Sequence, residues 1–251
     1  MQKKLISILI VSLILFAVSC SKTDTKGTNS QSPSQATDVA FKTPEEAITS
    51  YLDGVARNDI SKILQACAIN EMGGNFKFDL YTARVGGMNL QYLSPSEYQF
   101  YAEMNKTLLS SQILNQVKNL SYGLLSGEKV DGSPIFPADA DRANRFVKDV
   151  DPGKLSKLEI KKISLSNKTV MNDAKYMENA AKYARIFGAD ESTERLVLFS
   201  LEDNYYYIGF TLLRFGGNWK ISSQNSPLGN TDPLGTPKKT TAEDFESMIN
   251  H

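Results

Sequence analysis

The sequence has few of the residues that most often carry catalysis and metal binding. Its 251 residues include one histidine, His251, and two cysteines, Cys20 and Cys67. A four-coordinate zinc site built from histidine and cysteine needs more ligands than these three. The 28 basic and 28 acidic residues balance, so no net charge favours nucleic acid or an acidic surface as a partner. The sequence therefore predicts no metal, no cofactor and no nucleic acid.

Residues 1–19 have the pattern of an export signal. Two lysines precede an apolar run at residues 5–18, which is too short to span a bilayer comfortably. The run ends in Ala17-Val18-Ser19-Cys20, which resembles the bacterial lipobox, whose cysteine is acylated and becomes the new N-terminus. In this motif, Ala17 occupies the position at which leucine is commonest in lipoboxes. We expect a lipoprotein anchored through Cys20 to the cell membrane or the outer membrane, facing the periplasm or the cell exterior; the alternative is a plain secretory signal.

The rest of the chain divides into three parts by composition. Residues 20–40 comprise Cys20, the expected lipidation site, and a polar segment that has too few large apolar residues to fold. We expect this segment to be a flexible tether with a reach of roughly 25 Å. Residues 41–224 are expected to form one domain. Residues 225–251 are a proline- and glycine-rich tail that ends in a short helix, with Phe245, Met248 and Ile249 on its apolar edge.

The domain is expected to begin with helices. Thr43-Pro44-Glu45-Glu46 has a capping hydroxyl, a proline suited to the first turn and a reciprocating glutamate. Asp59 is expected to cap a short helix at residues 60–68, whose apolar stripe includes Cys67 as a buried, inert thiol. Ser94-Pro95-Ser96-Glu97 is expected to open a long helical stretch with a bend or a new helix near residues 110–111. Its first buried stripe is expected to be Tyr98, Tyr101, Met104 and Leu108.

Strands are expected late in the chain. Alternation predicts a strand at residues 158–165, a helix at 172–187, and then strands at 195–201, 205–215 and 219–223. The last three strands are joined by short turns whose residues tolerate positive φ, so they should form an antiparallel meander. Trp219 is expected to be buried against the helices. This order of elements predicts an α+β fold with helices packed on an antiparallel sheet.

Two ends of this domain resemble a known superfamily. Thr43-Pro44-Glu45-Glu46-Ala47 with Tyr51-Leu52, Asn58-Asp59 and the closing hairpin at residues 206–222 are similar to the nuclear-transport-factor-2-like (SnoaL-like, cystatin-like) superfamily, and within it to bacterial lipoproteins of unknown function. The resemblance implies a cone, formed by a curved sheet wrapped on helices, whose open end can hold a ligand. The domain is longer than usual, which implies a helical insertion near residues 71–150. Isomerases, dehydratases, transport receptors and passive modules share this fold, so it assigns no activity.

Aromatic side chains are the candidate site. Tyr51, Tyr98, Tyr101, Tyr206 and Phe210 are expected to line the cone and contact a ligand. The preferred hypothesis is a non-catalytic envelope domain that binds a small apolar ligand or a partner protein.

The alternative is a SnoaL-like isomerase or dehydratase that uses a tyrosine and a carboxylate in the cone. No carboxylate on the expected inward stripes is a convincing base, and both Asp53 and Asp79 are expected on the surface. A buried carboxylate within hydrogen-bond reach of a pocket tyrosine would favour the enzyme.

Overall fold

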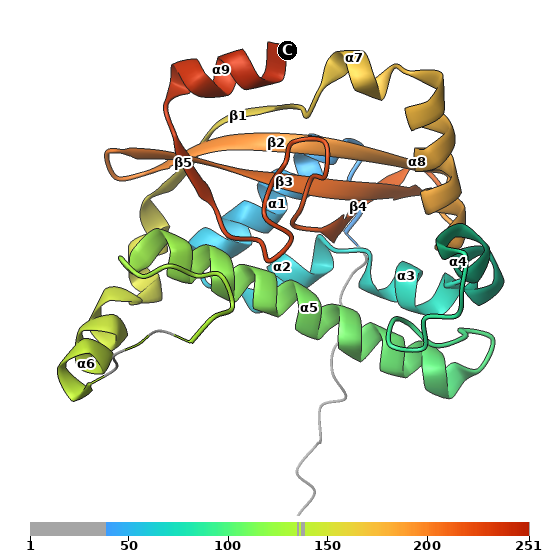
Figure 1. Cartoon of the computed structure of the whole chain (residues 1–251), viewed down its shortest axis with the longest axis horizontal. Helices are drawn as coiled ribbons and strands as arrows, with labels where there is room; N and C mark the ends of the chain where they lie inside the picture. The colour runs from blue at the N-terminus through green and yellow to red at the C-terminus, as the bar shows by residue number, and fades with distance from the viewer. Residues whose placement is uncertain (1–38, 135, 137–138, 251) are drawn as a thin grey trace, which may run out of the picture. The chain divides into compact units, whose positions relative to one another are not determined.

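The computed structural model describes residues 39–134, 136 and 139–250 (Figure 1). The expected export signal, Cys20 and most of the expected tether lie outside the described residues. Within this range the chain forms a single compact unit.

A five-stranded antiparallel sheet forms the centre of the fold. The strands β1 to β4 lie in the order of the sequence, and β5 pairs with β3 next to the β2–β3 turn. Glu202 in that turn has a φ of 53°, and Gly216 and Gly217 in the following turn also have positive φ. The predicted meander is therefore confirmed. The strands are β1 (Leu158–Leu165), β2 (Glu191–Leu201), β3 (Asn204–Phe215), β4 (Asn218–Ser223) and β5 (Lys238–Thr240).

The N-terminal helices cover one face of this sheet, as the sequence predicts. They are α1 (Pro44–Ala56), α2 (Ile60–Gln65) and α3 (Ile69–Asn75), whereas α4 (Phe78–Val85), which follows them, lies near the end of the sheet (Figure 1). Thr43 Oγ1 accepts a hydrogen bond from the backbone N–H of Glu46. The carboxylate of Glu46 in turn accepts a hydrogen bond from the backbone N–H of Lys42, so the expected cap of α1 is present. Asp59 caps α2 through the N–H of Lys62. The capping residues therefore fix where this layer begins.

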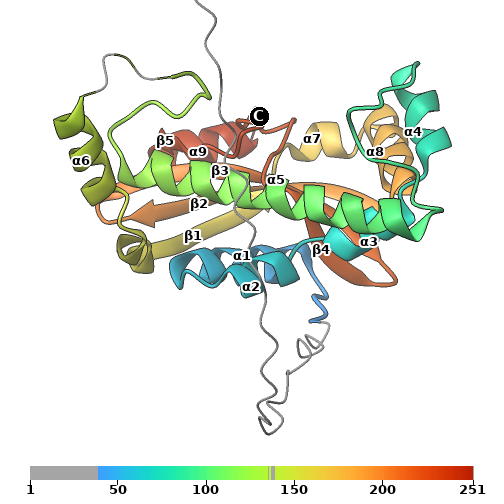
Figure 2. The same ribbon diagram turned by 90° about the horizontal axis from the view of Figure 1, so that it is seen from below.

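Helix α5 (Gln99–Leu125) runs unbroken for 27 residues along the sheet, beside α1 and α2 (Figure 2). The bend or new helix expected near residues 110–111 is therefore wrong. The helix opening expected at Ser94 is also wrong. The backbone N–H of Ser94 donates to Asn105 Oδ1, and the backbone carbonyl of Ser94 accepts from Asn105 Nδ2. The expected stripe is exposed, since another row faces the core: Ala102, Asn105, Leu109, Ile113, Gln116, Leu120 and Leu124. That row contains two amides, which an apolar pattern does not reveal.

The sheet buries apolar side chains on both faces. Along β2, Val197 and Phe199 pack with α1 and α5, whereas Leu196 and Leu198 point the other way, toward Phe245. Phe245 belongs to α9 (Ala242–Asn250), which covers the second face. The remaining helices are α6 (Ala140–Asp149), the 3-10 helix η1 (Pro152–Lys157), α7 (Lys168–Met171) and α8 (Ala174–Ile186). Helix α8 lies at the end of the sheet, near α4 (Figure 1).

The segment after residue 224 is part of the fold and not a peripheral tail. Gly209 of β3 and Gly229 have no side chains, which lets residues 226–231 approach the sheet closely. Strand β5 and α9 follow, and Phe245 and Ile249 are buried as the apolar edge predicted. The boundary expected at residue 224 therefore does not separate two structural units.

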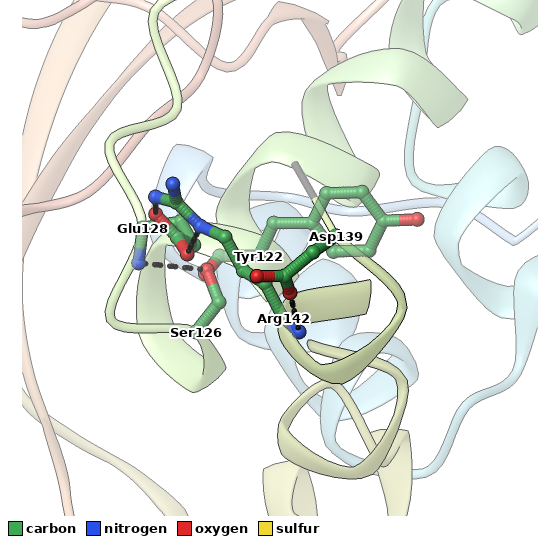
Figure 3. A network of polar contacts seen from close by, with 5 residues as sticks. All are labelled: Tyr122, Ser126, Glu128, Asp139 and Arg142. Carbon is green, nitrogen blue, oxygen red and sulfur yellow. Dashed lines mark hydrogen bonds and ion pairs between the residues drawn. The ribbon is translucent and has the colours of Figure 1, made fainter. Parts of the chain in front are cut away.

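A polar network fastens α6 to the end of α5 (Figure 3). Arg142 forms a bidentate ion pair with Glu128, at 2.7 Å and 2.5 Å, and Asp139 caps α6 through the N–H of Arg142. The ring of Phe146 packs edge-on against Tyr122 at 5.1 Å. The ion pair and the ring contact connect α6 to α5 and the residues that follow it, and the cap fixes the start of α6, so the network has a structural role.

Candidate functional site

A cavity of about 410 Å³ opens between α8, the sheet and helices α3 and α5. Its wall is partly apolar, with Met72 and Leu109, and partly polar. Glu194 and Arg84 are the two charged side chains that line it. Three tyrosines from two separate segments also line the cavity: Tyr92, Tyr176 and Tyr183.

Glu194 is a buried carboxylate on β2, with 6% of its surface exposed. Its Oε1 accepts a hydrogen bond from the hydroxyl of Tyr176 at 3.1 Å. Its Oε2 accepts from the hydroxyl of Ser226 at 2.6 Å and from the backbone N–H of Leu228 at 3.0 Å. The carboxylate thus joins α8, the sheet and the segment that follows β4.

Helix α8 presents one face to this cavity. Asp173 caps the helix, and Tyr176, Ala180 and Tyr183 follow at spacings of four and three residues, which places them on one side. Burial, and then the charge of Glu194 and its hydrogen bond, raise the pKa of Tyr176 above its ordinary value. Burial also raises the pKa of Tyr183, whose hydroxyl donates to Ser222 Oγ at 3.5 Å. Both phenols are therefore proton-bearing groups at neutral pH.

A β-bulge shapes the floor of the cavity. Thr211 of β3 pairs with Ser223 and Leu212 pairs with Ile221, so Ser222 is an extra residue in β4. Consecutive residues of a regular strand point to opposite faces, yet Ser222 and Ser223 both line the cavity. The bulge therefore adds a second hydroxyl to the wall.

Arg84 of α4 stands on the rim, exposed to solvent. Its Nη1 donates to the backbone carbonyl of Asn179 at 2.9 Å. Its guanidinium carbon lies 5.8 Å from the centre of the Tyr183 ring, a cation–π arrangement. These contacts hold one cation at the entrance.

The five aromatic residues predicted as the site do not come together, and none of them lines this cavity. Tyr51 and Phe210 are fully buried in the main core, with their rings edge-to-face at 5.4 Å. Tyr206 is half-buried and stacks on Phe199. Tyr98 and Tyr101 are 66% and 39% exposed, because the opposite side of α5 faces the core.

The expectations for Trp219, Cys67, Asp53 and Asp79 hold where the structure describes their burial. Trp219 is 8% exposed in the core that contains α1. Cys67 is a buried free thiol that donates to the carbonyl of Ile63. Asp53 contacts Lys62 and Arg57 at the surface, and Asp79 is exposed.

The sequence-based prediction missed Glu194, but the sequence contained one signal for this site. The expected strand began at Arg195, so Glu194 stood one residue outside it, whereas β2 begins at Glu191. Tyr176 and Tyr183 stand seven residues apart on a helix that the sequence did predict. A spacing of seven brings two side chains to the same helix face.

The fold is α+β, with helices packed on a curved antiparallel sheet, and it is similar to the fold of a solved cystatin-like structure. The chain is similar to a structure described as a cystatin-like protein from Ruminococcus gnavus ATCC 29149, with a TM-score of 0.55 and 22% sequence identity. The similarity covers 78% of this chain and 44% of the other, so this chain spans less than half of that protein. No family model and no curated protein matches the sequence.

Two further observations concern only the part of the chain that the structure describes. None of its helices is both long and apolar enough to cross a membrane. It also contains no group of three or more His, Cys, Asp or Glu side chains placed to hold a metal ion.

Proposed function

We propose that the domain binds a small molecule in the cavity beside α8, and that its role is binding without catalysis. The observation that supports this proposal is the wall itself, where Tyr92, Tyr176 and Tyr183 line the same cavity as a buried Glu194. Ligand sites are concave, largely aromatic and apolar, and contain a few fixed polar groups that orient the ligand. The occupant would have an apolar body and at least one polar group.

The contacts of Glu194 favour binding over acid–base catalysis. A general base gains a proton during each turnover, and a protonated carboxyl is a poorer acceptor. The same carboxylate accepts from Ser226 and Leu228, so a proton on it would weaken the attachment of that segment. Because the carboxylate of Glu194 anchors the wall of the cavity, it is better suited to remain charged than to accept and release a proton in each turnover.

Filling the cavity tests the binding proposal. Ala180 lines the cavity, whereas Ala181 is exposed on the same helix and does not. Titration of the full chain with small aromatic alcohols, followed by NMR, should shift resonances of Tyr176 and Tyr183. Ala180→Phe should abolish these shifts and Ala181→Phe should preserve them, with both variants folded by circular dichroism. Equal binding by both variants would place the ligand elsewhere and refute the proposal.

An acid–base enzyme is the second candidate, and one contact favours it. Tyr176 donates to Glu194 at 3.1 Å, which is the pairing of tyrosine and buried carboxylate that such chemistry needs. The raised pKa of Tyr176 keeps its hydroxyl protonated, so it can donate a hydrogen bond to a developing oxyanion. Turnover of any substrate that Glu194→Gln abolishes while ligand binding persists would establish the enzyme and exclude the purely binding role.

The export pattern supports a location outside the cytoplasm, with the domain attached through a lipid on Cys20. Labelled fatty acid should enter the wild-type protein and not a Cys20→Ala variant. Incorporation at the wild-type level in that variant would contradict the lipid anchor. Limited proteolysis should trim the chain to near residue 41 and leave the domain folded.

A further inference from the structure

Within the described residues, no cationic side chain forms a hydrogen bond or an ion pair with the carboxylate of Glu194. All three of its donors are neutral, and none of the ion pairs found in the described part of the chain includes it. Buried carboxylates are usually paired with a positive group or with a full set of donors, because removing a charge from water is costly. Two carboxylate oxygens offer about four acceptor positions, so three donors leave room for one more.

The rings around Glu194 suit a positive charge as well. The faces of tyrosine rings attract cations, and three tyrosines line the same cavity as the carboxylate. The protein already uses one of them in this way, because the guanidinium of Arg84 lies over Tyr183. Arg84 is exposed, so water and salt screen its repulsion of a second cation, whereas the field of the buried Glu194 is screened much less. The inner cavity therefore favours positive charge.

We propose that the cavity selects small organic cations, with a protonated amine that donates to Glu194 and an apolar body that packs against Tyr92, Tyr176 and Tyr183. This inference rests on the proposed binding function and adds the chemical class of the ligand. The amine replaces part of its water shell with a carboxylate and aromatic faces. A charge-assisted hydrogen bond and cation–π contacts together should favour the amine over a neutral analogue by at least about tenfold.

Three probes of similar shape test the proposal: 2-phenylethylamine, 2-phenylethanol and 3-phenylpropanoate, titrated calorimetrically into the full chain. The amine should bind most tightly and the carboxylate most weakly. Glu194→Gln should remove the preference for the amine and leave the affinity for the alcohol. Glu191→Gln is the matched control, because Glu191 lies exposed on the same strand, pairs with Arg214 and does not line the cavity.

The possible results separate this inference from the function on which it rests. If the alcohol binds and the amine binds no better, the cation preference is wrong and the binding function stands. If no probe binds, both are overturned for ligands of this size. Should Glu194→Gln fail to fold, the order of the three probes on the wild type still decides. Ala180→Phe then reports whether they occupy this cavity.

Discussion

Replacing Gly209 by alanine should loosen the wall of the cavity from the sheet. Gly209 lies on β3 opposite Leu196 of β2, and residues 226–231 pass directly over it. A Cβ atom at this position would lie 2.4 Å from Ser226 Cβ and 2.6 Å from the Ser226 backbone nitrogen. Because one of these atoms belongs to the backbone, the neighbouring segment must move as a whole.

The cost follows from that displacement. Adding a methyl group to a well-packed site costs about 1–3 kcal/mol, and each weakened hydrogen bond adds about 0.5–1.5 kcal/mol. Two such bonds, from Ser226 and Leu228 to Glu194, belong to the displaced segment. We therefore expect Gly209→Ala to lower the free energy of unfolding by at least about 2 kcal/mol. For a domain of this size the melting temperature should fall by roughly 4–8 °C.

Urea unfolding followed by circular dichroism measures this loss. Gly74 provides the matched control, because it lies in α3 and a Cβ there meets no atom within 4 Å. Gly74→Ala should stabilise the protein by up to about 1 kcal/mol through helix propensity. A loss below about 0.5 kcal/mol for Gly209→Ala would refute the close approach of the two segments.

Three further predictions concern other parts of the domain. Trp219→Ala should cost about 3–5 kcal/mol, measured by urea unfolding, because the indole is buried in the main core; a loss under about 0.5 kcal/mol would mean that it is exposed. Cys67 should resist a thiol reagent at pH 8 until denaturant is added, since burial raises its pKa; rapid labelling of the folded protein would contradict this. The hydrogen bond from Arg142 lowers the pKa of Glu128, so their pair should persist at neutral pH and be lost as the pH falls through that lowered pKa. The protection of α6 amides, measured relative to their intrinsic exchange rates, should then decrease on acidification, and in Arg142→Ala it should be low at both neutral and acidic pH.

The sequence was most informative where a local rule decides the structure. The caps at Thr43 and Asp59 need only the backbone that follows them, and both are found where predicted. The turns of the meander were equally local, because Gly216 and Gly217 adopt the positive φ that their residue type favours. Burial of Trp219 followed from alternation along one strand. These features need no knowledge of distant contacts.

Long-range polar contacts limited the prediction for α5. The buried side of this helix contains Asn105 and Gln116, which bond to Ser94 and to the segment after β4. The apolar pattern therefore favoured the side of the helix that contains Tyr98 and Tyr101, and these residues were predicted to belong to a ligand site. Only tertiary structure shows that two amides are satisfied in the core.

In the proposed binding site, Glu194 would contribute both to stability and to recognition of the ligand. Its Oε2 holds Ser226 and Leu228, and thereby the wall of the cavity, while its Oε1 accepts from Tyr176 on α8. Glutamine keeps one acceptor oxygen, so Glu194→Gln can retain part of the anchoring while it removes the charge. Tyr176→Phe does the converse, because it keeps the charge and the ring and removes one donor. If the charge is what recognises the ligand, an amine should still bind preferentially to Tyr176→Phe and lose its advantage on Glu194→Gln.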